Sequence, residues 1–208
     1  MRAPPYRLET ARLVVRCWEP HDAPLLKDAV DSSLEHVRPW LPWAHEAPLS
    51  LEQNVELLRR FRGQFDLDDE YAYGVFSRDE SEVVGGAGLH PRRGGPEACE
   101  IGYWIRASRA GEGLGTEATA AITRAGLEVA EAARIEVRVD PENAPSLRIA
   151  QKLGFVEEGL LRRVFYGPTA RAMERDALVF SLLRDELAGS PVAELELRAY
   201  DAAGERVL

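Results

Sequence analysis

A glycine-rich segment from Arg109 to Ala118 is the stretch whose residue types point most directly to ligand binding. It reads RAGEGLGTEA, follows the strand-like run YWI and precedes a long alanine-rich run. Backbone N–H groups at a helix start lack intrahelical partners, and the helix dipole adds about half a positive charge there. Glycine lets the backbone curve around an anion, and Thr116 could donate a hydroxyl, so the segment predicts a phosphate site. The alternative is a flexible loop whose glycines only relieve crowding.

Two common nucleotide-binding folds do not suit this segment. A Walker loop requires Lys and then Ser or Thr after its last glycine, and Thr116-Glu117 stands there instead. A dinucleotide-binding loop follows the first strand of a βαβ unit, whereas this loop follows the last strand of an expected meander. Both nucleotide-binding folds are therefore disfavoured.

Two side chains on neighbouring strand-like runs could act as a general base. In ACEIGYWI, Glu100 shares one face with Gly102 and Trp104. A carboxylate in a central strand is partly desolvated, which raises its pKa toward the range useful for proton abstraction. A solvent-facing strand glutamate is the alternative. His90, at the end of EVVGGAGLH, is the competing base, or else a surface residue at a strand edge.

Composition limits the class of protein and of partner. The 208 residues are 45% hydrophobic and 29% charged, which is typical of one soluble globular domain. A net charge of -9 argues against nucleic acid and suits an amine-bearing partner. No apolar run approaches the roughly 20 residues of a membrane span, and the first residues lack a secretory apolar region, so we expect a cytoplasmic protein without a membrane partner. Cys17 and Cys99 are too few for a disulfide framework or a metal cluster, and no metal site is expected.

Hydrophobic periodicity predicts the helices and strands of one α/β domain, and these elements must position the residues above. Helical spacing covers His21–Ser33, the run after Ser50 (a capping box with Gln53), the run after the glycine segment, and Pro145–Leu153 before Gly154. Strand-like runs are RLVVRCW, YAYGVFS, EVVGGAGLH, ACEIGYWI, RIEVRV, FVEEGLL and DALVFSLL. The turn-prone stretches SRDESE and PRRGGPE indicate that the second to fourth runs form an antiparallel meander.

Four stretches together resemble the GNAT superfamily of acyl-CoA-dependent N-acyltransferases. Residues 110–115, AGEGLG, match both glycines of its Gln/Arg-x-x-Gly-x-Gly/Ala signature and depart at the first position, where Ala110 follows Arg109. DPENAPSLRIAQKLGF resembles the second family block, Asn-x-x-Ser followed by Leu-Gly-Phe. Two stretches are similar to the branch of ribosomal-protein N-terminal acetyltransferases, the RimJ/RimL-like enzymes: RLETARLVVRCWEPHDA and HVRPWLPWA.

The resemblance implies an α/β (α+β) fold with a mixed, mostly antiparallel central sheet and helices on both faces. It also implies acetyl-CoA as the cofactor and gives each candidate residue a role. Glu100 would be the general base. Many members carry a tyrosine on the helix before Leu-Gly-Phe to protonate the leaving thiolate; this chain lacks one there, and Ser146 would contact the sulfur instead. Asn143 and Ser146 could equally be helix caps. The cofactor contacts implied are Ile105, Arg109, Gly111, Glu112, Gly113, Leu114, Gly115, Thr116, Asn143 and Ser146.

The same resemblance implies an acceptor site near Trp40, Trp43 and His90, with His45 a further candidate. The two tryptophans could equally fill the gap between the N-terminal helices. Acidic Glu46 and Glu70 would favour a cationic acceptor.

The expected reaction is transfer of an acetyl group to a primary amine by direct attack in a ternary complex, with a protein N-terminal amine as the leading acceptor. Acetylation of small amines such as aminoglycosides, polyamines or amino acids is one alternative, and a non-catalytic acyl-CoA sensor is another. We expect the acetyltransferase domain to span residues 8–187 and residues 188–208 to be a C-terminal extension able to form a β-hairpin. The sequence leaves open whether the protein forms a homodimer.

Overall fold

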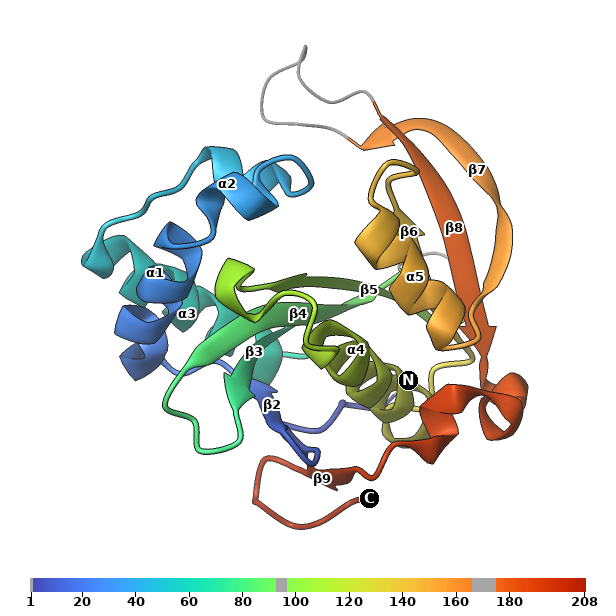
Figure 1. The fold of residues 1–208 in the computed structure, drawn as a ribbon. Helices are drawn as coiled ribbons and strands as arrows, with labels where there is room; N and C mark the ends of the chain where they lie inside the picture. Colours follow the sequence, from blue (N-terminus) through green and yellow to red (C-terminus); the bar gives the residue numbers. More distant parts are fainter. Residues whose placement is uncertain (1, 93–96, 166–174) are drawn as a thin grey trace.

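Nine strands form one sheet at the centre of the fold (Figure 1). The computed structural model describes residues 2–92, 97–165 and 175–208. The order is β7-β8-β6-β5-β4-β3-β2-β1-β9, and every described pairing is antiparallel except that of β5 with β6. The strands are β1 (Arg7–Glu9), β2 (Leu13–Cys17), β3 (Tyr71–Ser77), β4 (Val83–Pro91), β5 (Ala98–Ile105), β6 (Arg134–Val139), β7 (Val156–Phe165), β8 (Arg175–Leu183) and β9 (Arg198–Tyr200). The predicted meander is β3-β4-β5, and residues 93–96 of its second turn lie outside the described residues.

Helices form where the apolar spacing predicts them, and the pattern does not predict one further short helix, Leu34–Val37. At the start of α3, Gln53 N donates to Ser50 Oγ at 3.2 Å and Ser50 N donates to Gln53 Oε1 at 2.8 Å, which confirms the capping box. The helices are α1 (Ala23–Asp31), α2 (Leu34–Val37), α3 (Leu51–Asp66), α4 (Leu114–Arg124) and α5 (Ala144–Lys152). Shorter helical turns are η1 (Pro20–Asp22), η2 (Pro42–His45), η3 (Ala107–Arg109), the π-turn η4 (Ala125–Val129), η5 (Arg184–Gly189) and η6 (Pro191–Glu194).

The helices bury both faces of the sheet, so the predicted fold class is confirmed. On one face, residues of α1 and α3 pack on β2 and β3 around the buried side chains of Trp18, Leu58 and Phe76. On the other face, α4 and α5 pack on the central strands around Leu89 and Ile122. No helix in the described part of the chain is both long and apolar enough to cross a bilayer.

The parallel pair β5-β6 creates an opening in the middle of the sheet. Pairing runs from Ala98↔Arg134 to Ile101↔Val137 and stops there. The remaining part of β5, 102–105, leads into η3 and α4, while β6 ends at Val139 and leads into α5. The two strands therefore part toward the starts of the helices that carry the predicted cofactor motifs.

The C-terminal segment adds the last strand to the sheet. β9 pairs antiparallel with β1, a three-residue strand that the sequence pattern did not predict, and Ala199 is fully buried. A bridge between Tyr200 and Arg206 turns the chain back on itself. The tail is thus packed on the sheet edge through backbone hydrogen bonds.

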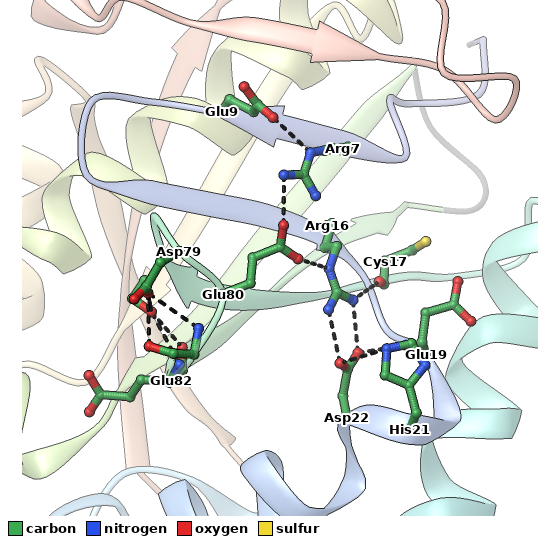
Figure 2. A network of polar contacts seen from close by, with 12 residues as sticks. Arg7, Glu9, Arg16, Cys17, Glu19, His21, Asp22, Asp79, Glu80 and Glu82 are labelled. Atoms are coloured by element: carbon green, nitrogen blue, oxygen red, sulfur yellow. Dashed lines mark hydrogen bonds and ion pairs between the residues drawn. The ribbon is translucent and has the colours of Figure 1, made fainter.

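An arginine-centred network ties the start of α1 to the sheet (Figure 2). Arg16 on β2 donates to both carboxylate oxygens of Asp22 at 2.8 and 2.9 Å, and its guanidinium lies 4.0 Å from the ring centre of Phe76. Its Nε donates to Glu80 at 2.6 Å, and Arg7 approaches the same carboxylate to 2.7 Å. Asp22 is only 2% exposed, so its buried charge requires the compensation that Arg16 supplies.

Asp22→Asn should lower the free energy of unfolding by roughly 2 kcal/mol, because it removes the charge from two buried hydrogen bonds and leaves the Arg16 guanidinium with Glu80 as its remaining charge partner. Urea denaturation followed by circular dichroism measures this change. The matched control is Arg59→Gln, which breaks the exposed pair with Glu56 and should alter the free energy by less than about 0.5 kcal/mol. Equal losses in the two variants would contradict the role assigned to burial.

Candidate active site

The opening between β5 and β6 continues into a cleft of about 600 Å³. Its walls come from α2 and the loop after it, the two diverging strands, the glycine segment and α5. The predicted residues that line it are Trp40, Glu100, Ile105, Arg109, Gly111, Gly113, Gly115, Thr116, Asn143 and Ser146. Within the described part of the chain, Glu112, Leu114, Trp43, His90 and His45 lie outside this lining.

The glycines at the start of α4 have two different tasks. Gly111 and Gly113 adopt φ of +85° and +80°, a conformation that residues with a Cβ rarely adopt. Among the described residues, no atom beyond the two chain neighbours of Gly111 would lie within 4 Å of a methyl group at that position. A methyl group at Gly115 would lie 3.1 Å from Ile149 Cδ1. The first two glycines therefore shape an open turn over the unsatisfied first amides of α4, and the third lets α5 pack against α4. An open turn of this kind fits a diphosphate.

Arg109 stands beside this turn. Its terminal nitrogens approach Glu82 and Glu112 to 3.3 Å each, and its buried Nε has no hydrogen-bond partner among the described atoms. A buried donor without a partner is costly, which makes Arg109 a candidate to bind an anion at the turn. The carboxylate of Glu112 pairs with Arg109 beside the cleft, and the side chain of Leu114 is 3% exposed in the core; these two residues can contribute backbone amides to the turn.

Glu100 lies on the floor of the cleft, one residue before the strands part. Its carboxylate is 25% exposed, 2.9 Å from Arg92 and 3.5 Å from Nε of Arg138. Desolvation raises the pKa of Glu100 above its ordinary value, and the attraction of Arg92 and His90 offsets only part of that rise. The direction agrees with the expectation from the strand pattern. The two arginines, which sequence reasoning missed, hold the carboxylate in place.

His90 faces Glu100 from the neighbouring strand. The two residues are directly paired across β4 and β5, and Nδ1 of His90 lies 2.7 Å from a carboxylate oxygen of Glu70. The imidazole therefore stands next to the candidate base and beside the cleft lining.

Ser146 meets a tyrosine that sequence reasoning missed. The hydroxyls of Tyr103 and Ser146 lie 2.8 Å apart, and Ser146 N donates to Oδ1 of Asn143 at 3.2 Å. Burial raises the pKa of Tyr103 to about 12, so its phenol keeps its proton. Tyr103 alternates with Ile101 and Ile105, and for that reason its position in the sequence pattern is typical of a core residue. The cap role of Asn143 is confirmed, and it is compatible with a cofactor contact.

The two tryptophans of the acceptor loop have different surroundings. Trp40 lines the cleft, and the guanidinium of Arg175 lies 5.6 Å from its ring centre. Arg175 also approaches Asp140, the residue after β6, to 2.8 Å. Its contact with Trp40 links the start of β8 to the α2 segment, which lies at the same end of the molecule (Figure 1). Trp43 instead packs edge-on against Trp104 at 5.7 Å between ring centres.

Comparison with known proteins agrees with this geometry. The family model described as an acetyltransferase (GNAT) domain matches residues 12–156. The ribosomal protein uS5-alanine N-acetyltransferase of Escherichia coli (strain K12) is 32% identical over 160 residues, covering 75% of this chain and 81% of that protein. A crystal structure of a probable acetyltransferase is 28% identical with a TM-score of 0.76, over 85% of this chain and 95% of that one. Mycobacterium smegmatis RimJ in complex with CoA-disulfide has the same fold, with a TM-score of 0.78 at 24% identity over 93% and 95% of the two chains. Because the family model matches most of its length and a named relative is 32% identical over three quarters of it, the chain belongs to the GNAT acetyltransferase family and is an acetyl-CoA-dependent N-acetyltransferase of the RimJ/RimL-like kind.

Proposed function

We propose that the protein acetylates the N-terminal amine of a protein or peptide. The observation that carries the acceptor class is the similarity, over three quarters of this chain, to an enzyme named for acetylating the alanine of ribosomal protein uS5. The cleft supports the proposal because it opens beside Trp40, where an extended chain end can enter and reach Glu100. Small-molecule amines remain the competing acceptor class.

The cofactor site is built from the residues around the parting strands. The amides around Gly113 and the side chain of Arg109 would hold the diphosphate, and the unpaired edge of β5 would hydrogen-bond the pantetheine arm, as a peptide adds to a sheet edge. Bound acetyl-CoA supplies a thioester whose carbonyl carbon accepts the amine nitrogen and whose sulfur leaves as a thiolate. Asn143 and Ser146 face that end of the site from the start of α5.

Glu100 would take the proton that the acceptor ammonium must lose before its nitrogen can attack. Partial burial makes the carboxylate a better proton acceptor than an exposed glutamate, and Arg92 and Arg138 fix its orientation. Transfer would be direct, because both cysteines are poor acyl acceptors: burial raises the pKa of Cys17 and of Cys99 to about 11.

Ser146 would stabilise the leaving sulfur, with its hydroxyl oriented by Tyr103. The tyrosine can donate to Ser146 Oγ while Ser146 donates to the sulfur, so the neutral phenol and the serine hydroxyl together would stabilise the thiolate by hydrogen bonding, each keeping its proton.

A panel of acceptors tests the acceptor class. Peptides that begin with Ala or Ser should be acetylated with a kcat/KM at least about tenfold above that of an aminoglycoside, a polyamine or a free amino acid. A tenfold difference in kcat/KM requires only about 1.4 kcal/mol of additional binding in the transition state. Thiol release from acetyl-CoA measures turnover, and mass spectrometry locates the acetyl group. Preference for the small amines would overturn the proposal, and absence of turnover on the whole panel would favour a sensor.

Glu100→Gln should lower kcat by roughly 10²- to 10⁴-fold and leave the affinity for CoA unchanged, because it removes the base without touching the glycine turn. Steady-state kinetics and calorimetric titration with CoA measure the two quantities. Glu128→Gln, which removes a carboxylate paired with Arg124 outside the lining, is the matched control and should retain activity. A normal kcat in Glu100→Gln would remove Glu100 from the mechanism.

Ser146→Ala should lower kcat by about tenfold and Tyr103→Phe by less, because the tyrosine acts through the serine. If so, adding Tyr103→Phe to Ser146→Ala should lower kcat no further, and a double-mutant cycle on kcat measures this coupling. Additive losses would mean that the two hydroxyls act independently.

A further inference from the structure

A row of ionisable side chains crosses the sheet at the level of the candidate base. His90 is paired with Glu100, and Glu100 is paired with Glu136, on three successive strands. Glu70 precedes β3 and extends the row, since its carboxylate lies 2.7 Å from Nδ1 of His90. Residues paired in register point to the same face of a sheet, so the row is contiguous from Glu70 to Glu136.

The imidazole of His90 lies over a floor made of glycines. A methyl group at Gly88 would lie 2.3 Å from Nε2 of His90, and one at Gly102 would lie 3.7 Å from the same atom. Since Gly102 lines the cleft, Nε2 points along the floor toward the cavity that holds Glu100. Larger side chains at these two positions would block that path.

Glu100 has one neighbour in this row that can accept a proton. On its other side, the guanidinium groups of Arg92 and Arg138 have donors only and cannot accept one. The carboxylate of Glu136 is occupied by ion pairs with Arg92 at 3.3 Å and with Arg134 at 2.9 Å. The hydrogen bond from Nδ1 to Glu70 favours the tautomer in which Nε2 of His90 is the free acceptor.

The side chains of the row become more exposed to solvent from Glu100 to His90 and Glu70. The side chains of His90 and Glu70 are 47% and 44% exposed, whereas Glu100 is 25% exposed. A proton that reaches the imidazole is therefore already at the solvent boundary, while one on Glu100 lies in the cleft under the acceptor.

We propose that His90, held by Glu70, is a relay residue that returns the proton taken up by Glu100 to solvent after each turnover. This inference rests on the role of Glu100 in the proposed function. The acceptor ammonium loses a proton to a carboxylate oxygen of Glu100; that O–H then protonates Nε2 of His90 through one water, and the carboxylate is restored. The imidazolium then gives its Nε2 proton to bulk water while Nδ1–H stays hydrogen-bonded to Glu70, which restores the neutral imidazole in its starting tautomer. No bond other than those to the proton changes.

His90→Gln tests the relay by its effect on the pH profile. We expect kcat to fall roughly tenfold, less than for loss of the base itself, with unchanged CoA affinity in calorimetric titration. Because a charged imidazole attracts the Glu100 carboxylate and lowers its pKa, removing it should raise that pKa. The acidic limb of kcat/KM, where the base must lose its proton, should then move to higher pH by up to about one unit. His21→Gln, at an exposed histidine before α1, is the matched control and should change neither quantity.

Two further variants separate a relay from a structural role. Glu70→Gln should reproduce most of the loss of His90→Gln, and the double variant should be no slower than the slower single one. Imidazole added to His90→Ala should restore kcat saturably, because a free base can occupy the space over Gly88 and Gly102.

A normal kcat and pH profile in His90→Gln, or a loss in His90→Ala that imidazole does not restore, would overturn the relay. Either result leaves the proposed function intact as long as Glu100→Gln is impaired. Normal turnover in Glu100→Gln would instead remove the base, and the relay with it.

Discussion

The end of β5-β6 pairing after Ile101 and Val137 is the constraint on which the site depends. In the middle of a sheet, backbone groups that lose their ladder partner must find another, because unpaired buried N–H and C=O groups are costly. Here the strands cannot close again: β5 runs on to α4 and β6 to α5, and the two helices meet through Ile149 over Gly115. The same contact that packs the helices keeps the strands apart. A cleft with a free strand edge, a helix start and a central carboxylate follows from that one divergence.

The electrostatic state of Glu100 is a balance set by the same geometry. A carboxylate this close to two guanidinium groups would ordinarily be strongly acidic. Desolvation by the cleft walls outweighs the attraction, so the net shift of its pKa is upward. The arginines are themselves shared with Glu136, which reduces the attraction that each gives to Glu100. The protein can thus hold the base rigidly and still leave it basic, a combination that a single unshared ion pair would not allow.

Local signals in the sequence predicted most of the fold and part of the site. The meander, the capping box at Ser50 and the glycine turn are encoded within a few residues, and each formed where its pattern indicated. The short strands β1 and β9 carry too few residues for a period to be visible, and their pairing joins the two ends of the chain. Arg92 and Arg138 belong to the site only because of strand register, which no window of sequence contains.

Tyr103 shows why a missing motif residue need not mean a missing group. The helix before Leu-Gly-Phe has no tyrosine, and its residues 148–152 read RIAQK. Ser146 at the start of that helix nevertheless has a phenol within hydrogen-bond distance, and the phenol comes from β5 across the cleft. The divergence of the strands makes this possible, since both the strand edge and the helix start border the same cavity. Where two elements line one cleft, either can supply the hydroxyl, and only the three-dimensional arrangement says which one does.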